Sequence, residues 1–271
     1  MTSLARHNGP GWARHPARLL RRLSAAAGIN PRGITDRIRS VPIYVFNLNR
    51  YRGRQHEVQD SLRLRFGYLN PQLRDRWQQA GAASGHYFHQ DVWAARRVFE
   101  SNPSRHVDVG SRIDGFVAHL LAFREVEVVD LRPLTTSQPG LRFTRASILS
   151  LPYADASLPS ISSLHTVEHV GLGRYGDPID PGGPFAAMSE LARVLASQGR
   201  LYLSVPVGVE RTEFDAHRVF SPITILKHLE HLALVEFSAV DDAGGYIEHA
   251  DPEAFVDAQY SCGLFVFSRQ E

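Results

Sequence analysis

From residue 106 onward, short apolar segments alternate with segments of helical periodicity, and this alternation constrains the fold more than any other feature of the chain. The expected strands are HVDVG (106–110), VEVVD (126–130), LRFTRA (141–146), SISSLH (160–165), RLYLSVP (200–206), LVEFSAV (234–240) and CGLFVFS (262–268). The expected helices are GFVAHLLAF (115–123), PFAAMSELARVLAS (184–197) and SPITILKHLEHL (221–232). Strands separated by helices are typical of βαβ units, so the pattern predicts an α/β fold whose mostly parallel, seven-stranded sheet is covered by helices on both faces.

The N-terminal part of the chain lacks this alternation. Residues 1–40 are rich in arginine, proline and glycine and are expected to form a basic, partly disordered arm with at most one short helix. Strand-like segments follow at VPIYVFNL (41–48) and LRLRF (62–66), and YFHQDVWAARRVFES (87–101) has the apolar spacing of a helix. The expected organisation is the arm (1–40), an N-terminal extension that packs on the core (41–84) and the α/β domain (85–271).

Charge is divided unevenly along the chain. Residues 1–80 contain 15 arginines and four acidic residues, a net charge of +11, whereas residues 81–271 carry a net charge of −9. Such an arm suits contact with an anionic surface, either a membrane or nucleic acid, or a solvated extension whose arginines pair with the acidic body. The solvated extension is the favoured alternative; if the arm does bind a surface, a membrane is expected and a nucleic-acid partner is not.

The cysteine content and the apolar runs indicate the compartment. The single cysteine, Cys262, excludes an internal disulfide and favours a reducing environment. No apolar run approaches the ~20 residues of a membrane span, and no convincing signal peptide is present. The expected location is the cytoplasm, at the inner face of the membrane if the arm binds lipid, and the oligomeric state is left open.

The turn after the first strand of the α/β domain, HVDVGSRIDGF, predicts a cofactor site. Gly110 permits a sharp turn close to a ligand. A phosphate-binding P-loop needs Lys and Ser or Thr after its second glycine, but Phe116 and Val117 follow Gly115, and GSRIDG lacks the middle glycine of a dinucleotide fingerprint. S-adenosylmethionine carries no phosphate and needs neither pattern. Asp130, at the end of the next strand, stands where a carboxylate would bind the ribose hydroxyls.

The next segment resembles class I S-adenosylmethionine-dependent methyltransferases. RASILSLPYADASLPSISSLHTVEHV is similar to their adenine-binding loop and fourth strand, which implies a Rossmann-like fold with Ser147 and Ile148 beside the adenine. Ser147 stands where an aspartate is usual, and Arg112 and Asp114 stand where glycine is usual. The cofactor-binding residues that the strand ends and this resemblance together imply are Asp108, Gly110, Ser111, Asp130, Leu131, Ser147, Ile148 and His165.

A closer resemblance covers roughly residues 85–269. GHYFHQDVW, HVDVGSRIDGFVAHL, VEVVDLRPL, EHVGLGRYGDPIDPGG, ELARVLASQGRLYLSVPVG and EFDAHRVFS are similar to a methyltransferase-like family catalogued as a domain of unknown function. GLGRYGD and EFDAHR are the motifs most specific to it. Members of that family are often associated with the synthesis of cell-surface polysaccharide, so the resemblance implies a sugar or glycan as the acceptor.

Two histidines compete for the role of catalytic base. HTVEH (165–169) matches the His-x-x-Glu-His motif of zinc peptidases, but the glycines at 171, 173 and 176 prevent the long helix that this motif requires. In the methyltransferase fold the fourth strand ends over the transferred methyl group, which implies that Glu168 and His169 face it. A neutral histidine can remove a hydroxyl proton and a carboxylate can orient it. His169 is therefore favoured as the base, and His217 in EFDAHR is the alternative.

Other polar groups near these strand ends are expected to hold the acceptor. They are Arg174, Tyr175, Asp177, Glu213 and Arg218. Tyr175 would supply a face for a sugar ring. The alternatives are structural: Arg174 and Asp177 would form a loop salt bridge, and His165 would bond a backbone group. A divalent metal at Glu168, Asp177 or Asp180 is left open by the spacing, and no metal site is assigned.

Two functions are therefore expected from the sequence. The first is an S-adenosylmethionine-dependent O-methyltransferase that acts on a sugar, a surface glycan or its precursor. The second is a non-catalytic, methyltransferase-like module that binds or organises partners in glycan assembly, and the substitution of Arg112 in the glycine turn favours it.

Overall fold

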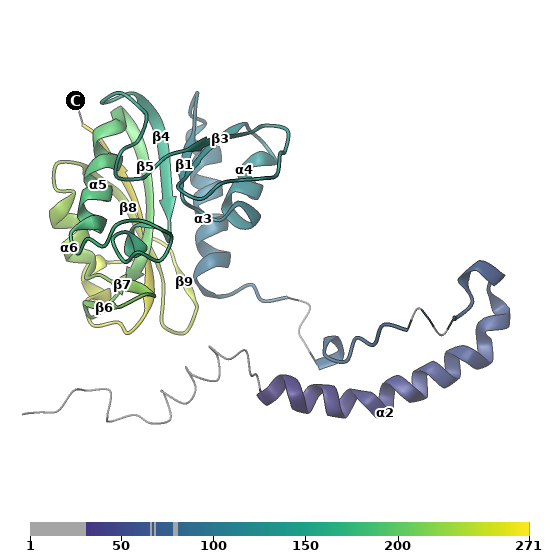
Figure 1. The fold of residues 1–271 in the computed structure, drawn as a ribbon. Helices are drawn as coiled ribbons and strands as arrows, with labels where there is room; N and C mark the ends of the chain where they lie inside the picture. Colours follow the sequence, from purple (N-terminus) through teal and green to yellow (C-terminus); the bar gives the residue numbers. More distant parts are fainter. Residues whose placement is uncertain (1–30, 66, 68, 78–80, 271) are drawn as a thin grey trace, which may run out of the picture. The chain divides into compact units, whose positions relative to one another are not determined.

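The computed structural model describes residues 31–65, 67, 69–77 and 81–270, and the chain forms two units, residues 1–82 and 83–271 (Figure 1). Most of the basic arm expected at 1–40 lies outside the described residues. Its last part, residues 31–40, belongs to helix α2 (Pro31–Arg54), so the domain boundary expected after residue 40 falls inside a helix.

The N-terminal unit corrects two expectations about strands. VPIYVFNL (41–48) lies inside α2, where two of its residues, Val41 and Val45, continue a helical stripe that begins at Ile34 and Ile38. The described residues of LRLRF, 62–65, contain no strand: Asp60–Leu62 is a 3-10 turn, and no neighbouring strand in the described part of this unit offers hydrogen bonds. Further 3-10 turns are Gln55–Glu57 and Asp75–Trp77.

The C-terminal unit contains an eight-stranded sheet in the order β3-β2-β1-β4-β5-β10-β8-β9. The strands are β1 (Val107–Val109), β2 (Val126–Asp130), β3 (Leu141–Arg145), β4 (Leu158–Leu164), β5 (Leu195–Val207), β8 (Ala233–Val240), β9 (Tyr246–Ile247) and β10 (Ser261–Ser268). Strands β1 to β5 pair in parallel, and β10 runs antiparallel to both β5 and β8. All seven expected strands are present, β9 adds an eighth at the edge, and the Rossmann-like α/β fold is confirmed.

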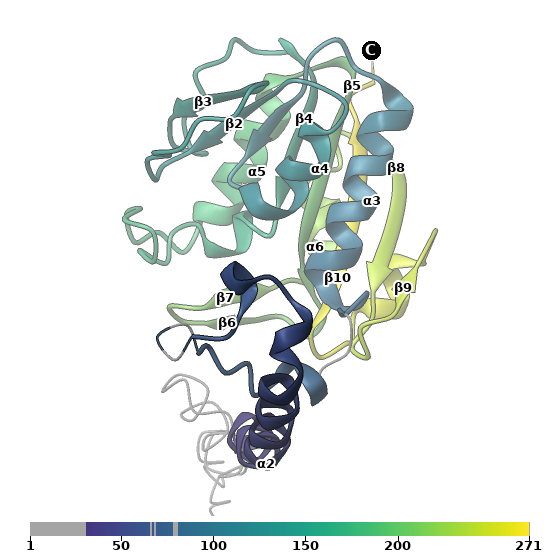
Figure 2. The ribbon, with the colours of Figure 1, turned by 90° about the vertical axis from the view of Figure 1, so that its right-hand side faces the viewer.

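Helices cover both faces of this sheet (Figure 2). Helix α3 (Gly85–Ser101) and a π-helical turn (Ile113–Val117) that continues into α4 (Ala118–Leu121) contribute to one core cluster, whereas α5 (Gly183–Val194) and α6 (Pro222–His228) contribute to the other. The two core clusters lie on opposite faces of the sheet. Side chains of β5 alternate between them: Leu201 and Leu203 point into one cluster and Tyr202 into the other.

Two of the expected helices are shorter than their patterns suggested. The helix expected at 184–197 ends at Val194, because Leu195 already pairs with Leu158 as the first residue of β5. The helix expected at 221–232 ends at His228.

A small hairpin was not expected from the sequence. Strands β6 (Arg211–Glu213) and β7 (His217–Val219) form a separate two-stranded sheet, and EFDAHR spans its turn.

The order of the strands positions the site. Successive connections move outward from β1 to β2 and β3, and the chain then returns to place β4 on the other side of β1. Sheets of this kind bind ligands at the carboxyl ends of their strands, next to such a reversal. The loops after β1 and β4 are therefore the first place to look for a site.

Candidate functional site

A cavity of about 310 Å³ opens at the carboxyl ends of β1 to β4. Nine of the residues that the sequence predicted for the site line it: Gly110, Asp130, Leu131, Ser147, Ile148, His165, His169, Tyr175 and Asp177. The remaining predicted residues do not line the cavity; they are Asp108, Ser111, Glu168, Arg174, Glu213, His217 and Arg218.

Gly110 shapes the turn after β1 for two separate reasons. Its φ is +77°, in the left-handed region that side chains disfavour. A Cβ atom at this position would lie 2.5 Å from Cγ2 of Thr166, which comes from the loop after β4. The turn is also held by the Gly110 N–H, which donates to the Val129 carbonyl oxygen at 2.9 Å. Glycine here allows the two loops to meet at the cavity.

Asp108 and Ser111 support the turn from below, which corrects their expected place at the cofactor. The Asp108 carboxylate is fully buried and accepts hydrogen bonds from Ser111 Oγ and Ser162 Oγ, both at 2.6 Å, and from the Ser111 N–H at 3.1 Å. Burial raises the pKa of Asp108 to about 6, although these hydrogen bonds oppose the shift. These contacts order the loop that carries Gly110.

Asp130 lies at the cavity and is paired with a neighbouring arginine. Its Oδ1 accepts hydrogen bonds from Arg132 N at 2.8 Å and Arg132 Nε at 3.0 Å, and its Oδ2 accepts from Nη2 at 2.6 Å. The same guanidinium stacks over Tyr175, 4.7 Å from the ring centroid. Oδ1 already accepts two hydrogen bonds, so a ligand that bonds both carboxylate oxygens must displace part of this ion pair.

The loop after β3 forms an apolar wall of the cavity. Ala146, Ile148 and Leu149 line it together with Val129. Ser147 Oγ accepts a hydrogen bond from the Leu149 N–H at 3.2 Å, so this hydroxyl shapes the loop. A flat apolar group such as an adenine ring would find a suitable surface here.

The loop after β4 carries a coupled group of two imidazoles and a carboxylate. Glu168 is 1% exposed, and its Oε1 lies 2.7 Å from His165 Nδ1 and 3.6 Å from His169 Nε2. Burial alone would lower the pKa of His165, but the neighbouring Cys262 sulfur and the Glu168 carboxylate outweigh it and raise this pKa well above its usual value. Burial would raise the pKa of Glu168, but His165 holds it below its usual value.

A backbone contact defines which tautomer His169 adopts when its imidazole is neutral. Its Nδ1 lies 2.6 Å from the Ala216 carbonyl oxygen, and because a carbonyl can only accept, Nδ1 must carry the proton. In the neutral ring, Nε2 therefore holds the lone pair. Burial lowers the pKa of His169, although Glu168 acts in the opposite direction. The ring lines the cavity and meets Tyr175 edge to face. A neutral imidazole in this position can accept a proton at Nε2.

The EFDAHR residues predicted for the site, Glu213, His217 and Arg218, lie outside the lining of the cavity. The Arg218 side chain is buried and donates to backbone carbonyls, from Nη1 to Val170 O at 2.7 Å and from Nη2 to Asp180 O at 3.4 Å, so it supports the loop from behind. Glu213 accepts from Arg211 Nε at 3.0 Å. The His217 ring packs on Tyr260 at 4.9 Å, away from the cavity lining.

The GLGRYGD loop is ordered by its own backbone contacts. Asp177 accepts from the N–H groups of Gly171 at 2.5 Å and Tyr175 at 3.3 Å, and Arg174 donates to the Ala216 carbonyl at 3.0 Å. The alternative salt bridge between Arg174 and Asp177 is therefore not formed. Gly171 has a φ of +80°, and a Cβ there would lie 1.8 Å from Asp180 O.

Four polar or aromatic residues at the cavity were not among the predicted site residues. Tyr87 comes from α3, Arg112 stacks over it at 5.2 Å, and Arg132 and Thr166 complete the wall. Arg132 could have been inferred from its position two residues after the strand-end carboxylate. Tyr87 gave no such signal, because a tyrosine in an amphipathic helix is most simply read as part of the packing.

The family described as "Caenorhabditis protein of unknown function, DUF268" matches residues 152–242. This segment contains both GLGRYGD and EFDAHR, and it spans 91 of the 271 residues. The description of the family assigns no activity. No curated protein matches the chain.

Several solved structures are similar in fold. The N-methyltransferase NodS from Bradyrhizobium japonicum WM9, in complex with S-adenosyl-L-homocysteine, is 17% identical over 69% of this chain and 89% of that chain, with a TM-score of 0.46. The 1,6-didemethyltoxoflavin-N1-methyltransferase from Burkholderia thailandensis is 15% identical over 68% and 84%, with a TM-score of 0.42. The [4+2]-cyclase SpnF is 14% identical over 68% and 81%, with a TM-score of 0.47. Because such a fold can host different reactions, an activity has to come from the residues of the site.

Proposed function

We propose that this chain is an S-adenosylmethionine-dependent O-methyltransferase that acts on a sugar, a surface glycan or its precursor. The observation that carries the proposal is the cavity at the reversal of strand order, where Gly110, Asp130 and a neutral His169 meet. These three residues come from the ends of three different strands.

The residues of the cavity fit this cofactor. Gly110 provides a close backbone approach, Asp130 provides an acceptor for ribose hydroxyls once Arg132 is displaced, and Ile148 and Leu149 provide an apolar wall for adenine. When bound, the cofactor supplies an electrophilic methyl group on a sulfonium.

His169 would act on the acceptor. Its Nε2 lone pair can take the hydroxyl proton while the new oxygen–carbon bond forms, and the Nδ1 bond to Ala216 holds the ring in that tautomer. Glu168 Oε1, 3.6 Å from Nε2, would stabilise the imidazolium produced by this transfer. The fixed positions of base and cavity wall would hold the reactants in line, which is the other main source of rate.

A sugar acceptor is supported by the rim of the cavity. Tyr175 is 38% exposed, and the guanidinium groups of Arg132 and Arg174 lie 4.7 Å and 5.1 Å from its ring centroid. Both guanidinium groups lie over the ring, so displacement of Arg132 would free an aromatic face for the apolar face of a sugar ring, and the arginine donors could bind its hydroxyls or a phosphate on a sugar precursor.

Titration of the full-length protein with S-adenosyl-L-homocysteine tests the cofactor assignment. We expect one saturable site by isothermal titration calorimetry, together with a rise in thermal stability, because a ligand that binds only the folded state stabilises it. Lack of binding would instead favour the non-catalytic module. The Asp130–Arg132 ion pair supports that alternative, because it already occupies the carboxylate.

A peripheral contact with anionic lipid is a second proposal, carried by helix α2. None of the helices in the described part of the chain combines the length and the hydropathy of a transmembrane span. Helix α2 exposes an apolar stripe of Ile34, Ile38, Val41 and Val45 and contains six arginines against one acidic residue. A basic helix with one exposed apolar face suits the interface of an anionic bilayer, here the inner face of the cytoplasmic membrane.

Sedimentation with vesicles tests this lipid contact. We expect the full-length protein to sediment with vesicles of phosphatidylglycerol and phosphatidylcholine at low salt, and less so as salt screens the charges. Ile38→Glu should reduce sedimentation strongly. Asn47→Glu introduces the same charge on the opposite face of α2 and should reduce it less. Equal losses in the two variants, or no sedimentation of the parent protein, would rule out the stripe as the contact.

A further inference from the structure

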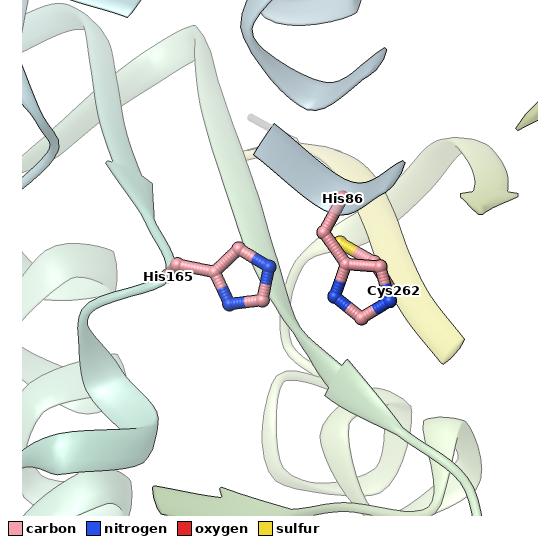
Figure 3. A group of neighbouring side chains, drawn as sticks. All are labelled: His86, His165 and Cys262. Carbon is pink, nitrogen blue, oxygen red and sulfur yellow. The ribbon is translucent and has the colours of Figure 1, made fainter. Parts of the chain in front are cut away.

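Three metal-ligating side chains from distant parts of the chain meet beside the cavity: His86, His165 and Cys262 (Figure 3). One donor atom from each lies within 4.8 Å of the other two. His86 is in the first turn of α3, His165 follows β4, and Cys262 is the second residue of β10. The sheet order β4-β5-β10 brings the last two residues to one edge.

The ring of His165 is held in a way that leaves one nitrogen free. Its Nδ1 bonds Glu168 Oε1 at 2.7 Å, whereas its Nε2 is buried and has no hydrogen-bond partner. The His165 side chain is only 4% exposed, so this nitrogen is shielded from water. A buried polar atom without a partner is costly, and a bound ion would satisfy it.

The backbone of His165 shows that the position is specifically built. Its φ is +48°, in the left-handed region that is unfavourable for a non-glycine residue. Two hydrogen bonds to Ser204, from the His165 N–H to the carbonyl oxygen at 3.0 Å and to Oγ at 3.1 Å, hold this conformation. Figure 3 shows the resulting orientation, in which the imidazole of His165 is turned toward that of His86.

His86 and Cys262 present their donors to the same point. His86 Nε2 lies 3.1 Å from the Tyr260 carbonyl oxygen, so Nε2 carries the proton and Nδ1 keeps the lone pair. Cys262 is completely buried. It is also the only cysteine of the chain, so its sulfur cannot serve an internal disulfide.

We propose that His86, His165 and Cys262 bind a zinc ion. Imidazole nitrogen and thiolate sulfur are the ligands that zinc prefers, and on binding the Cys262 thiol and Nε2 of the protonated His165 ring would each release one proton to solvent. The contact between Glu168 and His165 Nδ1 is the carboxylate–histidine arrangement that commonly orients a zinc ligand. Zinc bonds of 2.0–2.3 Å require the donor atoms to approach to about 3.5 Å of one another, so the stacked rings of His86 and His165 must rotate.

Three protein ligands leave a fourth position for water or for an acceptor atom, as zinc sites that act in catalysis do. Because His165 also lines the cavity, the ion would lie at the wall of the proposed methyl-transfer site. The zinc site does not depend on the proposed function, since its ligands are separate from Gly110, Asp130 and His169.

Cobalt substitution tests this site with a readout other than activity. Full-length protein, stripped with chelator and titrated with Co²⁺, should bind one equivalent and develop a near-ultraviolet thiolate-to-cobalt charge-transfer band that Zn²⁺ then removes. With a single cysteine in the chain, this band can arise only from Cys262. Absence of the band in the parent protein would overturn the proposal, whether or not any variant folds.

Variants identify the other two ligands. Cys262→Ala should abolish the band, and His86→Gln and His165→Gln should each weaken Zn²⁺ binding at least tenfold in competition with a chromophoric chelator. His89→Gln is the matched control, one turn further along α3, where the ring stacks on Tyr246 instead. It should bind zinc like the parent. Unchanged zinc affinity in both His86→Gln and Cys262→Ala would contradict the assignment.

Discussion

Replacing His169 with alanine is expected to lower kcat by about 10²–10⁴-fold, the usual contribution of a general base. Among the described residues that line the cavity, His169 is the only histidine whose tautomer is set by a hydrogen bond to a backbone carbonyl. This bond runs from Nδ1 to Ala216 O at 2.6 Å. Turnover should be measured with the sugar acceptor that gives the highest rate in a panel. Affinity for S-adenosyl-L-homocysteine should change little, because His169 is assigned to the acceptor.

The pH profile gives an independent measure of the same group. A base acts when it is unprotonated, and burial lowers the pKa of His169 below its usual 6.5. The value of kcat/KM should therefore be fully developed above about pH 6.5 and should fall only as the pH drops through the lowered pKa. His169→Ala should lose this acid limb.

Two other histidines serve as controls for this prediction. His119 also has its Nδ1 against a backbone carbonyl, Gly115 O at 2.8 Å, but it lies outside the cavity lining, so His119→Ala should retain kcat. His217 does not line the cavity, and His217→Ala should at most raise KM. If His217→Ala lost kcat while His169→Ala kept it, the two roles would be exchanged.

Replacing Asp130 with alanine should weaken the binding of S-adenosyl-L-homocysteine by about 10- to 150-fold. Two charge-assisted hydrogen bonds to the ribose are worth roughly 1.5–3 kcal/mol, and each 1.4 kcal/mol is tenfold in Kd. Calorimetric titration measures the change directly. Arg132→Ala should keep or raise the affinity, because Arg132 competes for the same carboxylate.

Glu125 provides the matched control for Asp130. It precedes β2 at the opposite end of the strand, and its carboxylate forms an exposed ion pair with Arg142 at 2.9 Å. Glu125→Ala therefore removes a paired carboxylate from the same strand region without touching the cavity. A Kd that responds equally to Asp130→Ala and Glu125→Ala, or to neither, would show that the ribose is not bound at Asp130.

Much of the C-terminal unit could be predicted because its signals are local. Periods of 2 and 3.6 residues in the apolar pattern predicted all seven strands of the core sheet and the helices between them. Parallel strands share one carboxyl edge, so Gly110, Asp130 and His169 could be expected near one another from their positions after strands alone. The boundaries of helices and strands were less predictable, as the early start of β5 at Leu195 shows.

The errors in the N-terminal unit have a different cause. The run VPIYVFNL is rich in β-branched and aromatic residues, and this local composition favours a strand. The structure continues α2 through it, and Val41 and Val45 of the run share one helical face with Ile34 and Ile38. The helical period of 3.6 residues becomes visible only when residues 31–40 are considered together with the run.

Sequence alone determined which residues follow each strand, because that depends only on order along the chain. Tertiary structure decided which of them reach the cavity: Asp108 and Arg218 are turned inward to support loops, and EFDAHR is a hairpin turn. Tertiary structure also brought Cys262 beside His165, since these residues are nearly 100 positions apart and meet only through the order of the strands. Contacts between distant segments depend on how layers pack, and periodicity along the chain carries no record of that packing.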